Sequence, residues 1–313
     1  MTFRPSHLCN LGLTAGLLAL AQSADAVPLY ASGQLLIPGD PGIPFGEPGH
    51  DDSRENYVFE IDSVTGVATP ISPVTSGLPA GLGGFGGTLY GWSGNTLQIV
   101  DPITGITTAA GTATAYSATG FDVSASGVGY GITNSDDQLF SVDLVSGNAT
   151  AVGAAGLVNN ALADAGVTDA DAFIISLASV GGDLYGLDLS TNSLVSIDPA
   201  TGTAQVVGGL GSLDTVGGGV FSGYSALTGV DEDSDGQFDA LFGAVNFVNP
   251  DGPEGSVRLG GVARFDLGDG TWDLVGLNEQ VIFFGMASQP VPEPSSLALL
   301  GIAGACLLRR RRH

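Results

Sequence analysis

DLYGLDLSTNSLVSIDPATG, residues 183–202, has the pattern of two strands and a turn that recurs in the rest of the chain. Apolar and polar side chains alternate between Leu194 and Ile197, which is the pattern of a strand with one buried face. The pair Asp198-Pro199 starts a turn, because proline fixes φ and an aspartate accepts local backbone hydrogen bonds. Gly202 stands where a hairpin needs a residue that adopts positive φ. The stretch therefore predicts two short strands joined by a tight turn.

The same pattern recurs along the chain between Val27 and Gln289. Other copies begin at Leu89-Tyr90-Gly91 and Tyr130-Gly131, and weaker ones at Leu29-Tyr30 and Leu241-Phe242-Gly243. The aspartates of the series are Asp62, Asp101, Asp143, Asp198 and Asp266, at spacings of 39, 42, 55 and 68 residues. Periods of this length with several strands per unit are typical of propeller blades. We expect an all-β fold, a β-propeller of about five blades, with a two-sheet sandwich or an open β-solenoid as rivals.

Each unit also has a short apolar run before its Leu-Tyr-Gly, such as 172–179 or 121–127, which we expect to be the innermost strand. The run 281–287 has the same character but no repeat after it. It therefore predicts a strand that completes the first blade and closes the ring, so that no edge is left unpaired. The extra length between Gly153 and Ala172 predicts a short helix with one apolar side, formed by Leu157, Ala161, Leu162 and Ala165. The repeats resemble those of secreted bacterial propellers that lack a known enzyme activity. Because the repeat motif is permissive, this resemblance indicates the architecture only.

Both ends of the chain have the composition of targeting segments. Arg4, an apolar run from Leu8 to Leu20 and the small residues around Ala24 form a secretory signal peptide, residues 1–26. At the other end, the sequence Val-Pro-Glu-Pro at 291–294 leads into an uncharged apolar stretch, 295–308. Fourteen residues of helix reach about 21 Å, which is a marginal membrane span. The terminal arginines Arg309, Arg310, Arg311 and Arg312 would keep that end cytoplasmic and leave the body of the protein outside.

This C-terminal segment, residues 290–313, resembles the PEP-CTERM sorting signal of Gram-negative bacteria. The resemblance lies in Pro292, Glu293 and Pro294, the short apolar helix and the arginine cluster, in that order. It implies transient anchoring in the inner membrane, processing by an exosortase near the Pro-Glu-Pro residues, and a final place at the cell surface, outer membrane or extracellular matrix. Proteins with this signal are associated with exopolysaccharide and biofilm matrix. Signal peptidase and exosortase are thus the expected processing enzymes, and a plain C-terminal anchor is the alternative.

Charge and cysteine content restrict what the body, residues 27–289, can do. The whole chain carries 32 acidic and 8 basic residues, a net charge of −24, and has 50 glycines among 313 residues. Only Arg54, Arg258 and Arg264 lie in the body, which excludes nucleic acid as a partner because no basic surface is available. Both cysteines, Cys9 and Cys306, fall in the terminal segments. An exported body without disulfides must be stabilised by its core or by a bound metal.

The most specific local chemistry is the string DEDSDGQFD, residues 231–239. Carboxylates at alternate positions, a glycine for a tight turn and a further carboxylate form a set of hard oxygen ligands suited to Ca²⁺. No EF-hand is expected, because Phe242 occupies the twelfth position. The string resembles the DxDxDGxxD loop of integrin-type propeller repeats, which implies the ligands Asp231, Asp233, Asp235 and Asp239 through side chains and Gln237 through its backbone carbonyl. A solvated acidic turn is the alternative interpretation.

A second acidic patch consists of Glu47, His50, Asp51, Asp52 and Glu55. It holds the only histidine of the body, which permits metal binding or proton transfer, although an exposed loop is the simpler interpretation. With no lysine in the chain and no cysteine in the body, nucleophilic schemes based on those residues are excluded, and we assign no catalytic residue. We predict an exported, non-catalytic surface or matrix protein stabilised by Ca²⁺. The alternative is a secreted carbohydrate-active hydrolase or lyase with a carboxylate pair in the propeller funnel, where Trp92 and Trp272 would be the only indole platforms.

Overall fold

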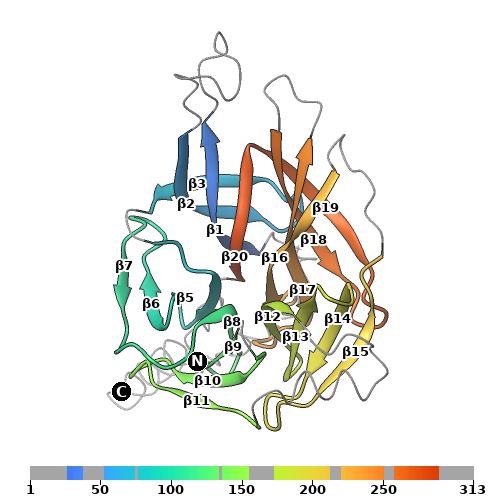
Figure 1. The fold of residues 1–313 in the computed structure, drawn as a ribbon. Helices are drawn as coiled ribbons and strands as arrows, with labels where there is room; N and C mark the ends of the chain where they lie inside the picture. The colour runs from blue at the N-terminus through green and yellow to red at the C-terminus, as the bar shows by residue number, and fades with distance from the viewer. Residues whose placement is uncertain are drawn as a thin grey trace, which may run out of the picture.

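The computed structural model describes residues 27–37, 53–74, 77–133, 136–154, 173–211, 220–249 and 257–288. These residues form twenty strands in five antiparallel sheets of four strands each. The sheets are arranged around a common axis, with one strand of each sheet at the centre and one at the periphery (Figure 1). The prediction of an all-β propeller with five blades is confirmed.

Each blade has its four strands in order from the axis outwards. Blade 1 consists of β20 (Val281–Ser288), β1 (Pro28–Ile37), β2 (Ser53–Asp62) and β3 (Ala68–Pro73). Blade 2 consists of β4 (Gly81–Phe85), β5 (Thr88–Ser93), β6 (Thr96–Val100) and β7 (Thr107–Ala109). Blade 3 consists of β8 (Ala118–Val123), β9 (Val128–Thr133), β10 (Leu139–Asp143) and β11 (Ala149–Ala151). Blade 4 consists of β12 (Ile174–Val180), β13 (Asp183–Asp188), β14 (Ser193–Ile197) and β15 (Ala204–Gly209). Blade 5 consists of β16 (Val220–Val230), β17 (Ala240–Asn249), β18 (Val257–Phe265) and β19 (Trp272–Glu279).

The ring is closed by the last strand of the chain. β20 pairs antiparallel with β1, and the pairing runs from Leu29 opposite Ser288 to Leu35 opposite Val281. The innermost strands contact one another in the order β20, β4, β8, β12, β16 and back to β20. The predicted closing strand is therefore confirmed: β20, from the end of the chain, is the inner strand of blade 1.

Five apolar clusters fill the five spaces between neighbouring blades. The space between blades 1 and 5, for example, contains Phe59 and Phe283 from blade 1 and Phe242 from blade 5, each at most 2% exposed. The space between blades 2 and 3 contains Trp92 against Phe121 and Phe140. Burial of each such side chain contributes about 1.5–3 kcal/mol. In the described part of the chain, stability thus comes from blade-to-blade packing.

The repeat turns have one geometry in all five blades. In each, the backbone N–H of the repeat glycine donates to the carbonyl of the aspartate four residues earlier, at 2.8–2.9 Å. The five glycines have φ between 67° and 78°, the left-handed region in which a side chain is strained. They are Gly66, Gly105, Gly147, Gly202 and Gly270. The turn predicted from Asp-Pro and Thr-Gly is confirmed.

These turn glycines also join the blades. A Cβ atom on Gly105 would lie 2.3 Å from the carbonyl oxygen of Pro73, at the end of the outer strand of blade 1. Equivalent close approaches join Gly66 to Gly276, Gly147 to Gly111 and Gly270 to Gly208. Glycine is therefore required at these turns for its φ angle and for the space that it leaves to the neighbouring blade.

Candidate functional site

The DEDSDGQFD loop connects β16 to β17, the first two strands of blade 5. Its first aspartate, Asp231, is 8% exposed, whereas Asp233 and Asp235 are exposed. Gly236 and Ser234 adopt positive φ angles of 89° and 61°, which bend the loop back on itself. Blade 5 therefore presents the loop at the end of the propeller where its inner strand ends.

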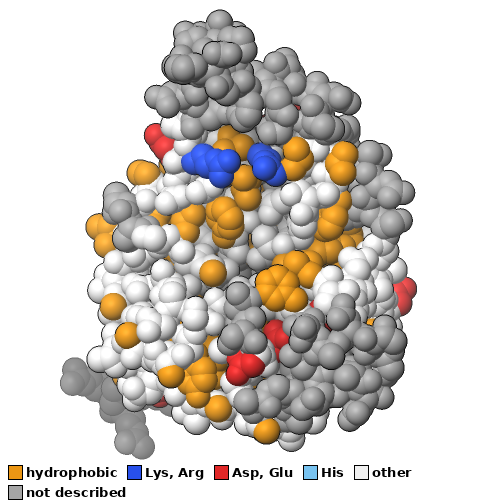
Figure 2. All heavy atoms as spheres, viewed as in Figure 1, with side chains coloured by type: hydrophobic (Ala, Val, Ile, Leu, Met, Phe, Trp, Pro, Cys, Tyr) orange, Lys and Arg blue, Asp and Glu red, His pale blue; other side chains and the backbone are white. Residues whose placement is uncertain are grey.

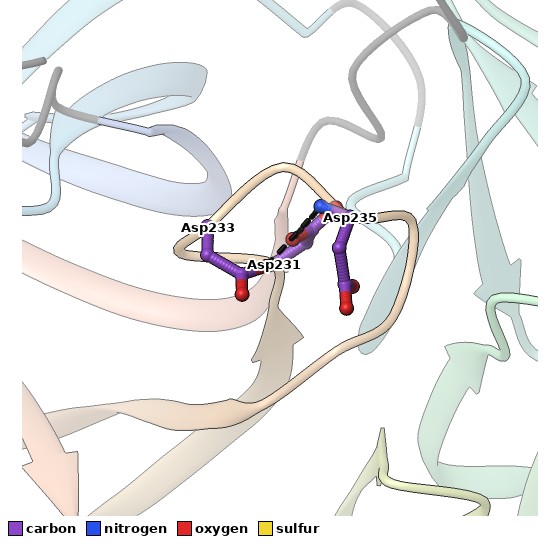
Figure 3. A group of neighbouring side chains, drawn as sticks. All are labelled: Asp231, Asp233 and Asp235. Carbon is purple, nitrogen blue, oxygen red and sulfur yellow. Dashed lines mark hydrogen bonds between the residues drawn. The ribbon is translucent and has the colours of Figure 1, made fainter. Parts of the chain in front are cut away.

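Three of the predicted ligands converge. Asp231, Asp233 and Asp235 each offer a carboxylate oxygen, and these oxygens lie within 4.8 Å of one another (Figure 3). Backbone N–H groups of the loop hold the carboxylates in place. The N–H of Asp235 is shared between Oδ1 of Asp231 and Oδ1 of Asp233, both at 3.1 Å, and the N–H of Gly236 donates to Oδ2 of Asp231 at 2.8 Å. The donor set is composed of hard oxygens and fits a Ca²⁺ ion.

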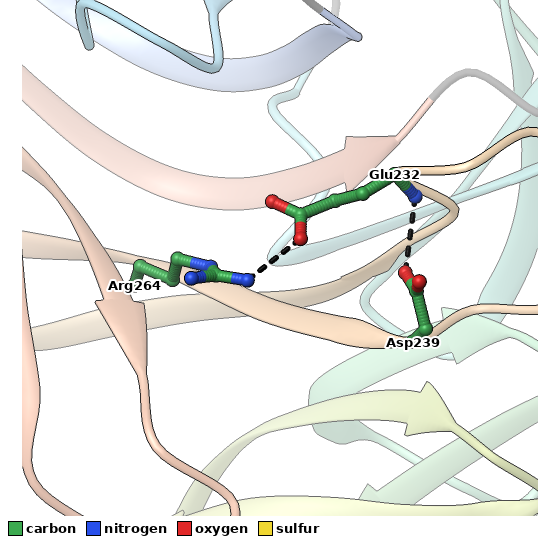
Figure 4. Close-up of polar contacts among 3 residues, drawn as sticks. All are labelled: Glu232, Asp239 and Arg264. Carbon is green, nitrogen blue, oxygen red and sulfur yellow. Dashed lines mark hydrogen bonds and ion pairs between the residues drawn. The ribbon is translucent and has the colours of Figure 1, made fainter. Parts of the chain in front are cut away.

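The other two predicted ligands are placed differently. Oδ1 of Asp239 accepts a hydrogen bond from the backbone N–H of Glu232 at 3.0 Å, so this carboxylate ties the two ends of the loop together (Figure 4). The N–H of Gln237 donates to Oδ1 of Asp235 at 2.8 Å, and the role of its carbonyl oxygen stays a prediction. Glu232 forms an ion pair of 2.6 Å with Arg264 of β18. Both side chains of that pair are about half exposed, so it contributes at most about 1 kcal/mol.

The electrostatics of the loop are those of crowded negative charges. The backbone N–H of Asp235 lowers the pKa of Asp233, but partial desolvation and the charges of Asp235, Asp239 and Asp231 outweigh it and raise that pKa above its usual value. Like charges within a few ångströms disfavour ionisation. A divalent cation bound between the carboxylates would remove this repulsion.

A buried carboxylate at the axis is a feature that the sequence analysis missed. Asp122, on the inner strand β8, is 2% exposed, and its Oδ2 accepts the N–H of Ser179 from β12 at 2.8 Å. Burial raises the pKa of Asp122 well above its usual value, although hydrogen bonds from the N–H groups of Ser179, Val123 and Gly229 act in the opposite direction. The carboxyl group thus links the inner strands of blades 3, 4 and 5. The signal in the sequence was an acidic residue inside the apolar run 121–127.

A sizeable cavity lies at the other end of the axis. It has a volume of about 530 Å³ and is lined near the beginnings of the inner strands by residues that include Gln34, Asn56, Ile175, Ser225 and Phe284. The residues that the structure describes around it include no carboxylate, so the pair that a glycoside hydrolase needs is not found there. Trp92 is fully buried between blades, and Trp272 donates its indole N–H to the carbonyl of Leu210. Neither lines this funnel.

The basic side chains of the body are confined to two blades. Arg54 lies on β2 of blade 1, and Arg258 and Arg264 lie on β18 of blade 5. On the face drawn in Figure 2, the basic side chains in view are gathered over these blades, and hydrophobic side chains are scattered over the rest.

Several predicted features lie outside the described residues. They are the signal peptide 1–26, most of the helix predicted between 153 and 172, the patch residues Glu47, His50, Asp51 and Asp52, the Pro292-Glu293-Pro294 motif with its apolar segment, and Arg309 to Arg312. Glu55 of the patch is described and accepts a hydrogen bond of 2.9 Å from the hydroxyl of Tyr57. Within the described ranges, no helix is long and apolar enough to cross a membrane.

Comparisons with known proteins concern the fold and the C-terminus. Among solved structures, a chain of the nidogen/laminin complex is similar with a TM-score of 0.44 and 12% identity, covering 83% of this chain and 97% of that chain. Regucalcin from Agrobacterium tumefaciens, a calcium-binding protein, is similar with a TM-score of 0.37 and 14% identity, covering 83% of this chain and 75% of that chain. At such TM-scores these similarities define neither a ligand nor an activity. No curated protein matches the chain.

The family comparison matches the C-terminal segment. The PEP-CTERM protein-sorting motif matches residues 290–312, which begin two residues after the closing strand β20. This agrees with the resemblance carried by Pro292, Glu293, Pro294 and the terminal arginines. The chain is a five-bladed β-propeller that carries a PEP-CTERM sorting motif, which implies an exported protein processed by an exosortase.

Proposed function

We propose that the propeller is a non-catalytic protein of the bacterial cell surface or extracellular matrix, that it associates with exopolysaccharide, and that Ca²⁺ bound by residues 231–239 stabilises its fifth blade. The observation that carries the calcium part is the convergence of the Asp231, Asp233 and Asp235 carboxylates within 4.8 Å. The association with matrix is supported by the sorting motif at 290–312. A Ca²⁺-loaded loop also presents a cation to anionic polymers outside the cell.

Calcium binding is tested by the thermal stability of residues 27–289 with EDTA and with about 10 mM CaCl₂. Extracellular calcium sites have dissociation constants of about 10⁻⁴ to 10⁻³ M. Ligand linkage then predicts a stabilisation of about 1.4–2.7 kcal/mol. For a domain of this size that corresponds to an increase in Tm of about 3–10 °C. A melting curve that is the same in both solutions would remove Ca²⁺ from the proposal.

The variant Asp233→Asn separates a calcium site from a solvated acidic turn. Without Ca²⁺ the substitution removes a repelling charge, so the variant should melt above the wild type. With Ca²⁺ it should melt below the wild type, because a ligand is lost. Glu60→Gln, which removes an exposed carboxylate from β2, is the matched control and should respond to Ca²⁺ like the wild type. A solvated turn predicts that Asp233→Asn melts higher in both solutions.

Processing and location are tested in the source bacterium with a chain in which Pro292, Glu293 and Pro294 are replaced by alanine. We expect this variant to remain in the inner-membrane fraction at unprocessed mass, while the wild type appears in the surface or matrix fraction. Release of the wild type from the matrix by a polysaccharide-degrading enzyme supports the association with exopolysaccharide. Equal distribution of wild type and variant would contradict the sorting part of the proposal.

A further inference from the structure

The funnel cavity of about 530 Å³ has the size of a small-molecule site, since such sites span roughly 300–1,000 Å³. Its apolar surface comes from Leu78, Pro79, Ile175 and Phe284. Four side chains that can form hydrogen bonds, Gln34, Asn56, Thr119 and Ser225, also line it, and the described lining contains no charged group. The cavity therefore combines apolar walls with a small set of neutral polar groups.

Gln34 and Asn56 form a pair that leaves hydrogen-bonding capacity unused. Nε2 of Gln34 donates to Oδ1 of Asn56 at 3.1 Å, across the register of β1 and β2. One carbonyl oxygen and one amide NH₂ group of the pair then remain for a ligand. Exchanging the amide orientations of both residues leaves the same two functions. The pair thus offers an acceptor and a donor side by side.

Thr119 and Ser225 add one more hydrogen-bond acceptor and one more donor. The hydroxyl of Thr119 donates to the carbonyl of Ile174 at 2.8 Å, so its lone pairs are left as acceptors. Oγ of Ser225 accepts from Nδ2 of Asn246 at 3.0 Å, which leaves its hydroxyl proton for a ligand. Asn246 is itself held on both sides by the backbone of Phe283. The position of Ser225 is therefore fixed before any ligand arrives.

An independent observation is the hydroxyl of Ser176. This side chain is 3% exposed, and its Oγ is the one buried polar side-chain atom in the described part of the chain without a hydrogen-bond partner. Ser176 borders a space of about 10 Å³ that shares Ala80 and Ser225 with the funnel cavity. That volume suits a single water or a single ligand hydroxyl. An unpaired buried hydroxyl destabilises the fold, and a hydrogen-bond partner in this space would remove that cost.

We propose that the funnel cavity binds a neutral sugar, one or two uncharged hexose units of a polysaccharide. A hydroxyl both donates and accepts, so a polyhydroxylated ring satisfies the mixed set of donors and acceptors. A carboxylate or phosphate only accepts and would meet the field of a strongly acidic protein, whereas an ammonium group only donates. The C–H faces of the ring contact the apolar walls. The inference deepens the proposed matrix function and rests on it only for the source of the sugar.

The cavity opens away from the attachment point of the sorting motif. The inner strands all run in one direction along the axis, and the cavity lies near their beginnings, at Ala118 of β8 and Ile175 of β12. Ser288, the last residue of β20, lies at the opposite end, where it bonds to Thr228 and Gly229. A chain still attached to the membrane by its tail can therefore present the funnel outwards.

The test is isothermal titration of the full-length protein, purified in a detergent without sugar head groups, with cellotriose and maltotriose. Trigalacturonate and the glucosamine trimer are the anionic and cationic comparisons. We expect heat from a neutral trisaccharide and at least tenfold weaker binding of both charged ones. Absence of binding by both neutral trisaccharides at millimolar concentration, or stronger binding of a charged one, overturns the proposal.

Two variants locate the site. Gln34→Leu with Asn56→Leu keeps the volume while removing the amide pair, and should weaken sugar binding about tenfold or more. Ser176→Ala should weaken binding while leaving the thermal stability of the sugar-free protein unchanged or higher, because the unpaired hydroxyl is gone. Gln205→Leu, on the exposed outer strand β15, is the control and should bind like the wild type. Wild-type affinity in both cavity variants overturns the proposal.

Failure of this inference and failure of the proposed function give different results. The calcium loop and the funnel lie at opposite ends of the axis. If EDTA leaves the Tm unchanged and the protein still binds a neutral trisaccharide, the calcium part of the proposed function fails and the sugar site is retained. A protein that is recovered with exopolysaccharide but shows no cavity-dependent binding retains the matrix role and loses the sugar site.

Discussion

Replacing Gly105 by alanine tests the contact between blades directly. Gly105 ends the repeat turn of blade 2 at a φ of 67°, and an added Cβ would lie 2.3 Å from the carbonyl oxygen of Pro73 in blade 1. The left-handed conformation costs an alanine about 1–2 kcal/mol. Displacing the neighbouring backbone adds roughly 1–3 kcal/mol, by analogy with overpacked cores. We expect Gly105→Ala to lower the free energy of unfolding by about 2–5 kcal/mol.

The control for this variant lies in the same blade. Gly94, in the turn between β5 and β6, has a φ of 61°, and an added Cβ would meet nothing within 4 Å. Gly94→Ala therefore carries only the conformational cost, about 1–2 kcal/mol. The loss of chain entropy in the unfolded state is equal in the two variants and cancels in their difference.

The assay is urea denaturation of residues 27–289, followed by circular dichroism, with both variants and the wild type. The difference between Gly105→Ala and Gly94→Ala isolates the contact with Pro73. Equal destabilisation of the two variants would show that the repeat glycine is required for its φ angle alone. The argument that these turns join the blades would then be refuted.

Three further predictions concern the stability contributed by Asp122, by Asp198 and by the closing strand β20. Burial raises the pKa of Asp122, so the free energy of unfolding of the wild type should fall as the pH rises above 3.8, the usual pKa of an aspartate. Asp122→Asn should make the free energy of unfolding depend less on pH in urea titrations between about pH 4 and 8. The backbone N–H of Ala200 and the hydroxyl of Thr201 lower the pKa of Asp198, so this group contributes stability that is present above its usual pKa and lost as the pH falls. Asp198→Asn should therefore reduce the loss of unfolding free energy on the acid side in the same titrations. A chain truncated after Gln280 lacks β20 and the buried Phe283 and Met286, so it should show no cooperative thermal transition.

The five-bladed ring could be predicted because its signals are local and repeated. Alternation of apolar residues, the Asp-Pro and Thr-Gly turns and the spacing of the repeat aspartates each depend on a few neighbouring residues. Closure by 281–287 was predictable for a different reason, since this run resembles an inner strand and no repeat follows it. Strand ends were less accurate: the run expected at 172–179 forms β12 at Ile174–Val180.

Features that depend on contacts between blades could not be predicted from the repeat. The sequence explains the φ of Gly105 but contains no sign that Pro73, far earlier in the chain, occupies the space where a side chain would lie. The burial of Asp122 depends on N–H groups from two other inner strands, which only the closed ring brings together. The funnel cavity likewise combines residues of blades 1, 3, 4 and 5 with the segment 78–80, which leads into blade 2.

The candidate calcium loop shows the same limit on a smaller scale. Alternating carboxylates at 231, 233 and 235 converge because three neighbouring residues of one loop cannot lie far apart. Asp239 has the expected spacing, yet its carboxylate accepts the N–H of Glu232. Spacing alone therefore predicts which residues are near one another, and not which partner each carboxylate takes when no ion is bound.

The position of the sorting motif relative to the closing strand constrains processing. Ser288 is 2% exposed and is held by the hydroxyl of Thr228 and the carbonyl of Gly229, so β20 is fixed in the ring up to its last residue. The motif begins only two residues later, at 290. A cleavage within Pro292, Glu293 and Pro294 leaves β20 complete, whereas a cut a few residues earlier would open the ring. Ser288 lies at the end of the axis opposite to the funnel, so cleavage at this motif would take place away from the funnel.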